Sequence, residues 1–256
     1  MKDDTARTPS RSLHPIGLAI LGLWLALGAA LLLVAEPPHL LDFAFVMVGW
    51  LLSVMAHEFG HALVGYWAGD HTVKAKGYLD FDPRRYASPA VTLGIPLLAL
   101  ALGGIGFPGG AVYLRNDLMR SRLWRAAASL AGPAVTAMIF LGLVLVLRVW
   151  GRAGATSELY PALGVLAFLQ AMALILNLLP IPGLDGFNAI RPFLPKAWGP
   201  TIRKLEGLSL LLLLVLVFVV PGAGAALFRA AATLSLAVGL DPTALNYGWN
   251  AFRFWR

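Results

Sequence analysis

The chain has 256 residues, of which 59% are hydrophobic and only 13% are charged, a composition that excludes an ordinary soluble domain and indicates a membrane protein. Its net charge of +7 does not indicate nucleic-acid binding, because the lysines and arginines lie mostly in short segments between apolar runs, where they set membrane topology. The chain has no cysteine, so a transition metal would have to be held by histidines and carboxylates.

The apolar runs predict an all-α polytopic membrane protein that forms a single membrane domain, 1–256. Residues 1–14 are polar, and we expect them to be a disordered cytoplasmic N-terminus. Ile16 to Ala35 is the first predicted span. A secretory signal peptide is the alternative, but the apolar run is longer than that of a usual signal peptide and no small-x-small cleavage site follows it.

About six transmembrane helices are predicted in all, with both termini in the cytoplasm and the chain in the cell (inner) membrane. The five further spans run from Leu41 to Ala68, Trp124 to Val149, Tyr160 to Leu179, Leu208 to Val220 and Ala223 to Val238. Basic residues in the intervening segments favour cytoplasmic loops at 70–90 and after Asp185. Residues 208–256 are expected to form a C-terminal helical hairpin and an interfacial tail.

Two stretches do not have the pattern of a simple span. Lys76 to Pro83 alternates like a short β-strand that ends in a turn. Residues 89–107 are apolar but interrupted by glycine and proline, and we expect a re-entrant or partly inserted element there. A full crossing would place the arginines between Arg115 and Arg125 outside, against the positive-inside rule, although the sequence leaves both possibilities open.

The second predicted span contains two histidines and a glutamate. His57 and His61 are four residues apart, so on a helix they share one face and are spaced like two zinc ligands. Glu58 is close enough to both to act on a water molecule without being a ligand itself. A buried histidine bonded to a carbonyl would explain one of them alone, but not this combination inside an apolar run.

Two histidines leave a catalytic zinc ion one protein ligand short. The remaining histidines are predicted at or beyond the membrane edge: His14, His39 and His71. Asp42 is on the same helix as His57 but about 22 Å away along its axis. Asp185 follows a helix that runs inward and lies in an irregular Pro-x-Pro-Gly-x-Asp-Gly stretch, which indicates a buried site at that depth. The alternative is an ordinary turn that ends one helix and caps the next.

Taken together, these motifs resemble the site-2 protease family of intramembrane zinc metalloproteases. The resemblance covers about 41–191, which would be the catalytic core, and rests on His57-Glu-Phe-Gly-His61 together with Asn177-x-x-Pro-x-Pro-x-x-Asp185-Gly and a Gly132-Pro133 helix between them. It implies one Zn²⁺ per chain with His57, His61 and Asp185 as ligands. It also implies Glu58 as the catalytic acid/base and Asn177 near the substrate peptide.

One position departs from the family pattern. Members often have asparagine four residues after the glycine of Gly132-Pro133, where this chain has Thr136, so the hydrogen bonding of that helix stays open. Only about 55 residues separate the span that contains His57 from the span that contains Gly132-Pro133, and the element at 89–107 uses many of them. An inserted PDZ domain does not fit there, since domains typically have about 50–200 residues. A minimal member is therefore expected.

The resemblance implies hydrolysis of peptide bonds within or near transmembrane segments of membrane-anchored proteins in the lipid bilayer. The alternative is a zinc-binding membrane protein without hydrolysis, either a transporter or an inactive scaffold. The sequence does not show the substrate or the oligomeric state.

Overall fold

The computed structural model describes residues 14–85, 112–153 and 156–255, and within these ranges the chain is helical and contains no strand. The expectations for 1–13 and for the element at 89–107 fall outside the described residues. The longer helices are α1 (Pro15–Leu33), α2 (His39–Ala68), α5 (Arg122–Arg152), α6 (Leu159–Asn177), α10 (Ala223–Ala237) and α11 (Pro242–Phe252). The shorter ones are α3 (Thr72–Ala75), η1 (Pro83–Arg85), α7 (Asp185–Ile190), η3 (Arg191–Phe193), η4 (Lys196–Trp198), α8 (Gly199–Gly207), α9 (Ser209–Leu214) and the π-helical η5 (Val215–Val219).

Within the described ranges, four helices are long and apolar enough to cross a membrane, namely α1, α2, α5 and α6. Their ends follow local sequence signals. Gly69, at a φ of +119°, ends α2 in the left-handed conformation that glycine adopts without strain. The side chain of Ser121 accepts a hydrogen bond from Trp124 N (3.2 Å) and caps the start of α5. These four predicted spans are confirmed to within a few residues.

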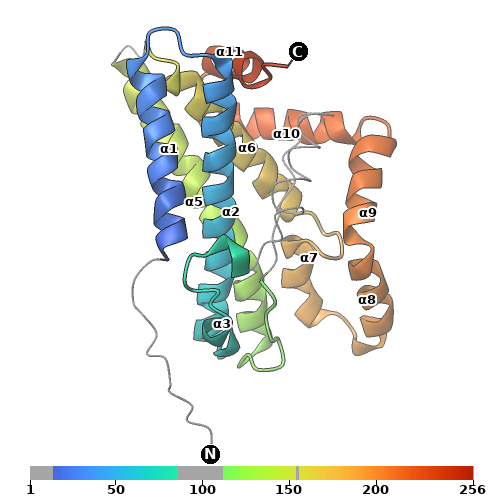
Figure 1. Cartoon of the computed structure of the whole chain (residues 1–256). Helices are drawn as coiled ribbons and strands as arrows, with labels where there is room; N and C mark the ends of the chain where they lie inside the picture. Colours follow the sequence, from blue (N-terminus) through green and yellow to red (C-terminus); the bar gives the residue numbers. More distant parts are fainter. Residues whose placement is uncertain (1–13, 86–111, 154–155, 256) are drawn as a thin grey trace, which may run out of the picture.

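The prediction of six spans was wrong, because the last two runs do not form a hairpin of two crossings. Leu211–Val219 and Ala223–Ala237 are bent by 88° at Pro221-Gly222, so together they can provide at most a fifth span. Leu208 to Val220 would extend only about 20 Å as a helix, less than the roughly 30 Å hydrocarbon core. In Figure 1, α9 stands beside the bundle and α10 turns back towards α6, against which it packs.

The strand predicted at 76–81 was also wrong. This stretch follows the one-turn helix α3 and continues in hydrogen-bonded turns, with Tyr78 N donating to Val73 O (3.0 Å) and Asp80 N to Gly77 O (3.2 Å). Gly77 has a φ of +73° and Phe81 a φ of +55°, and such residues interrupt an extended chain. The alternation of apolar and polar residues in this stretch therefore corresponds to successive turns and not to a strand.

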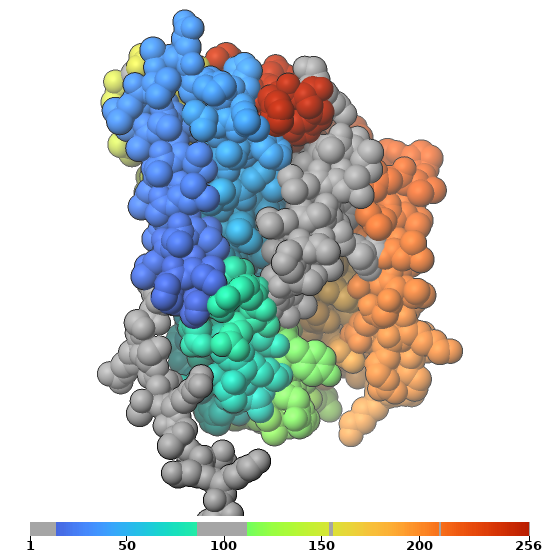
Figure 2. All heavy atoms as spheres, in the orientation of Figure 1, coloured from blue at the N-terminus to red at the C-terminus, as the bar shows by residue number. Residues whose placement is uncertain are grey.

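Helix α6 is the centre of the bundle. All residues from Pro161 to Ala173 are buried, and α2, α5, α10 and α11 pack around them. By contrast, α1 is largely exposed along its apolar length, as expected of a helix that faces lipid. In Figure 2, α1 (blue) and the α8–α9 segment (orange) form opposite sides of the molecule. Helices α2, α5 and α6 are thus held between α1 and the α8–α9 segment.

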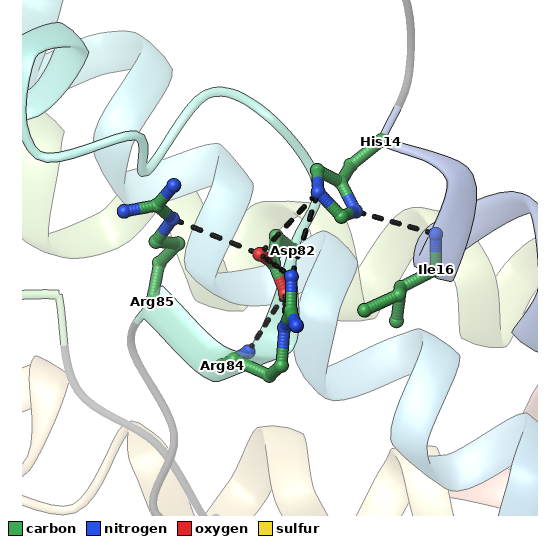
Figure 3. A network of polar contacts seen from close by, with 5 residues as sticks. All are labelled: His14, Ile16, Asp82, Arg84 and Arg85. Carbon is green, nitrogen blue, oxygen red and sulfur yellow. Dashed lines mark hydrogen bonds and ion pairs between the residues drawn. The ribbon is translucent and has the colours of Figure 1, made fainter.

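A polar cluster joins the start of α1 to the segment after α3 (Figure 3). Asp82 is buried and receives two hydrogen bonds from the guanidinium of Arg84 (2.9 and 3.0 Å), and His14 Nε2 lies 3.8 Å from the same carboxylate. His14 also caps α1 by accepting from Ile16 N (3.3 Å). The hydrogen bonds from Arg84 lower the pKa of Asp82 below its usual value. The cluster therefore fixes the start of α1 to the segment that follows α3.

The start of α1 and the helix α11 have different neighbours. His14, which precedes α1, donates through its backbone N–H to Asp80 O (3.1 Å) in the segment after α3, whereas Tyr247 in α11 donates to Glu158 (2.9 Å) at the start of α6. In Figure 1, α1 starts at about mid-height and runs upwards, and α11 lies at the top. The side of the membrane on which each terminus lies stays a prediction.

Candidate metal centre

Helix α2 places three functional side chains in the interior of the bundle. His57 and His61 point from one face, with their Nε2 atoms 3.0 Å apart, and Glu58 lies beside them. All three side chains are buried, with residue exposures of 6–8%. The four-residue spacing seen in the sequence therefore does bring the two imidazoles together.

Helix α5 orients both imidazole rings through their Nδ1 atoms. His61 Nδ1 lies 2.7 Å from the carbonyl oxygen of Ala128, and His57 Nδ1 lies 2.9 Å from Thr136 Oγ1. Since a carbonyl oxygen only accepts, His61 Nδ1 must be the protonated nitrogen, which leaves the lone pair of a neutral ring on Nε2. With His57 likewise protonated on Nδ1, the lone pair on its Nε2 points to the same position as the lone pair on His61 Nε2. Such contacts are typical of metal-binding histidines.

Two glycines allow α2 and α5 to approach each other at this level. A Cβ atom built on Gly132 would lie 2.6 Å from His57 Nε2 and closer still to His61 Nε2, and one on Gly60 would lie 3.0 Å from Ala131 O. Any larger residue would therefore displace either the rings or the helices. Gly132 is required by the space between the imidazoles, which explains why the Gly-Pro pair occurs inside this helix.

Asp185 reaches the histidines from the other end of the chain. It is the first residue of α7, after the turn that ends α6, and this turn includes Gly183 at a φ of +97°. A Cβ atom on Gly186 would collide with the backbone of Leu178, so the turn folds back closely on the end of α6. As a result, Asp185 Oδ2 lies 3.1 Å from His57 Nε2 and Oδ1 lies 3.4 Å from His61 Nε2.

The three side chains together have the donor set of a zinc site. One donor atom from each of His57, His61 and Asp185 lies within 4.8 Å of the others, and they are the one such group among the residues that the structure describes. A cation between the two Nε2 lone pairs and the carboxylate would neutralise the buried charge and bind all three donors. Two imidazoles and one carboxylate, with a further position free, are the ligands of several catalytic zinc sites. The residues present therefore fit Zn²⁺.

Glu58 is held beside the metal centre by a backbone group. Its Oε2 accepts a hydrogen bond from Val112 N (2.9 Å), at the start of the segment 112–115, which is neither helix nor strand. This segment is itself fixed, because Arg115 N donates to the buried carboxylate of Asp70 (2.6 Å) and Tyr113 O accepts from Lys76 Nζ (3.0 Å). The carboxylate of Glu58 thus has a defined position next to the three donors.

A cavity of about 990 Å³ contains the metal centre, and its lining includes His57, Glu58, His61 and Asp185. Asn177, which the sequence analysis placed near the substrate, is buried at the end of α6 and lines the same cavity. A separate space of about 20 Å³ lies behind His57 and Glu58 and is bordered by Asn177 and Gln170. Such a space is large enough for one water molecule.

Sequence reasoning identified the three donors and Glu58 but not their supporting contacts. Thr136 was recognised only as a departure from the family pattern, and its bond to His57 joins residues 79 positions apart. The Ala128 carbonyl and the Val112 N–H are backbone groups that any residue could supply, so no side-chain signal marks them. Gln170 is buried inside the apolar helix α6 and has no partner for its Nε2 among the described residues. A polar residue in the middle of an apolar run is a signal of a buried polar site that the sequence does contain.

The fold and site define an integral membrane protein with a buried zinc-binding centre, and comparison with known proteins assigns its family. The chain is 43% identical over 217 residues to "Putative zinc metalloprotease Rip2" of Mycobacterium tuberculosis strain H37Rv, covering 83% of each chain. It is 38% identical over 248 residues to the protein of the same name in Mycolicibacterium smegmatis, covering 94% of this chain and 93% of the relative. Identity to "Putative zinc metalloprotease YwhC" of Bacillus subtilis is 27% over 69% of this chain.

The chain therefore belongs to the site-2 protease family of intramembrane zinc metalloproteases, as its motifs indicated. No protein-family model and no solved structure matches it. It is a membrane-bound metalloprotease with Zn²⁺ as cofactor, and the alternative of a zinc-binding membrane protein without hydrolysis is not favoured.

Proposed function

We propose that His57, His61 and Asp185 are the zinc ligands and that Glu58 is the catalytic acid/base. The observation that supports this most strongly is the convergence of three donors whose rings are already oriented by Thr136 and Ala128. Glu58 lies outside the donor group and keeps a carboxylate oxygen next to it. These positions correspond to the division between ligands and base in the metalloprotease motif.

Bound Zn²⁺ would polarise the carbonyl of the scissile bond and lower the pKa of an attacking water molecule to about 7. Glu58 takes a proton from that water as it attacks, and then gives the proton to the nitrogen that leaves. Val112 N–H holds one oxygen of Glu58 (2.9 Å), which leaves the other oxygen free to exchange the proton.

The substrate is a membrane-anchored protein that is cut within or near its transmembrane segment. A transmembrane helix satisfies its own backbone hydrogen bonds, so it must unwind before one peptide bond can reach the metal centre. Asn177 would bond the unwound backbone, a role supported by its position in the lining of the cavity beside His57.

The catalytic core corresponds to about 41–191, and the chain lies in the cell (inner) membrane with the metal centre towards the cytoplasmic side. The basic segments after α2, before α5 and after α7 lie in the lower part of Figure 1, the part towards which the start of α1 points. The positive-inside rule assigns that part to the cytoplasm. The described start of the chain is therefore cytoplasmic.

Cleavage by the purified protein in liposomes tests this proposal. Wild-type protein is expected to cut a reporter with one transmembrane helix, and Glu58→Gln is expected to keep zinc but lose at least about 100-fold in rate. Glu36→Gln is the matched control, because Glu36 is exposed in the turn between α1 and α2. Cleavage by Glu58→Gln at the wild-type rate would refute the role of Glu58. Zinc flux into the liposomes that survives this substitution, without cleavage, would support transport instead.

A further inference from the structure

Four basic side chains line the cavity that contains the metal centre. They are Arg122, Arg125, Arg191 and Lys196. Arg125 and Arg122 precede Gly132 on α5 by two to three turns, which puts them about 10 and 15 Å from the metal centre along the helix axis. The described carboxylates that line the cavity are Glu58 and Asp185, and both belong to the metal centre. The part of the cavity nearer the cytoplasm is therefore positively charged.

This charge is mostly not neutralised by neighbouring groups. Arg191 pairs with Glu206 (2.8 Å), but no carboxylate of the described residues lies within 4.0 Å of Arg122, Arg125 or Lys196. The Nε atom of Arg125 is buried and has no hydrogen-bond partner among the described residues.

A further carboxylate outside the lining, Asp117, interacts electrostatically with Arg125, but its main partner is another arginine. Asp117 is bound by two nitrogens of Arg115 (2.6 and 2.9 Å), which holds its pKa down at about 2. The sequence from 86 to 111 contains no charged residue, so that segment adds no counter-charge. Three cations in a partly enclosed space favour an anionic ligand.

We propose that the substrates of this protease carry acidic residues on the cytoplasmic side of the scissile bond, and that Arg122, Arg125 and Lys196 bind them. The inference rests on the proposed function, since it places the substrate in this cavity. A peptide that is cut at the metal centre must continue past it, and the basic lining lies along the cytoplasmic part of the same cavity. Acidic side chains there would pair with the unneutralised cations.

The charge also excludes other membrane proteins. Cytoplasmic flanks of transmembrane segments are usually rich in lysine and arginine, and like charges brought together in a cavity repel each other strongly. A basic lining therefore rejects the common type of flank and accepts the rarer acidic one. This is selection by repulsion as well as by attraction.

Three reporters that differ only in their flank provide the test. Each has the same transmembrane helix, followed on the cytoplasmic side by three aspartates, three asparagines or three lysines. Wild-type protein in phosphatidylcholine liposomes is expected to cut the aspartate reporter with a kcat/KM about tenfold or more above that of the lysine reporter. The difference is expected mainly in KM, because the flank contacts are made equally in the ground and transition states.

Charge reversal in the protein should reverse this preference. Arg122→Glu with Arg125→Glu, or Lys196→Glu alone should the double variant not fold, is expected to favour the lysine reporter. Lys204→Glu is the matched control, because Lys204 is exposed on α8 and does not line the cavity. Zinc content and elution as a single species establish that each variant is folded.

Equal cleavage of all three reporters by the wild type would overturn the inference while leaving the protease function intact. Failure of the zinc-loaded wild type to cut any reporter would instead contradict the proposed function. A third outcome is that phosphatidylglycerol raises cleavage of all reporters equally and that the charge reversal removes this effect. The cations would then bind lipid headgroups, and the inference would be wrong.

Discussion

Gly132→Ala tests whether the approach of α5 to the two histidines is required for the metal centre. The added Cβ would lie 2.6 Å from His57 Nε2 and closer to His61 Nε2, whereas an ordinary contact between such atoms is at least about 3.4 Å. The rings and the helix must therefore separate by roughly 1 Å. Both Nε2 atoms face the metal position, so the displacement acts directly on the ligands.

A shift of this size is large compared with the tolerance of a metal site. Zinc–ligand distances hold to within about 0.2 Å, and an error of about 1 Å in a catalytic arrangement costs about 100-fold in rate. We expect zinc affinity to fall about 100-fold or more in Gly132→Ala. Overpacking between α2 and α5 adds about 1–3 kcal/mol of destabilisation.

Competition with a chelator, followed by metal analysis of the purified protein, measures the affinity. Gly142→Ala is the control on the same helix, because nothing lies within 4 Å of a Cβ at that position. It should keep full zinc affinity and activity, and should stabilise the helix by about 0.5–1 kcal/mol. Wild-type zinc affinity in Gly132→Ala would refute the close approach of α5.

Three further predictions concern the ligands and the polar cluster at α1. Thr136→Val should weaken zinc binding about 10- to 100-fold by removing the bond to His57 Nδ1, and Thr136→Ser should restore it in the same chelator assay; equal affinity for all three proteins would contradict this. Asp185→Asn should leave the purified protein largely without zinc while His57 and His61 remain, and full zinc content would exclude Asp185 as a ligand. Because Arg84 lowers the pKa of Asp82, the ionised carboxylate contributes stability above the usual pKa of 3.8 that is lost as the pH falls through the lowered value. The Tm of Asp82→Asn should therefore be lower than that of the wild type at pH 7, and the two should converge below about pH 4; a constant gap would argue against this cluster.

Much of the metal centre could be predicted from the sequence because its signals are local. The four-residue spacing of His57 and His61 determines that they share a helix face. Asp185 could be placed because the prolines and glycine before it end an inward-running helix. Long apolar runs likewise predicted α1, α2, α5 and α6, since few other structures accommodate so many apolar residues.

Features that depend on contacts between distant segments could not be predicted. The bond between His57 and Thr136 requires a particular rotation of α5 against α2, which hydrophobic patterning does not encode. The 88° bend at Pro221-Gly222 looks in the sequence like the tip of a hairpin, because proline and glycine mark both. The turns at 76–81 were mistaken for a strand because Gly77 and Phe81 take positive φ angles that alternation does not show.

Zinc K-edge X-ray absorption of the purified wild-type protein tests the central claim most directly. The account predicts about one zinc ion per chain, with imidazole nitrogens from two histidines at about 2.0–2.1 Å and oxygen ligands at about 2.0–2.2 Å. In His57→Ala the imidazole contribution should be halved or the metal lost. A zinc ion without imidazole scattering, or a chain that binds no zinc at all, would contradict the metal centre described here.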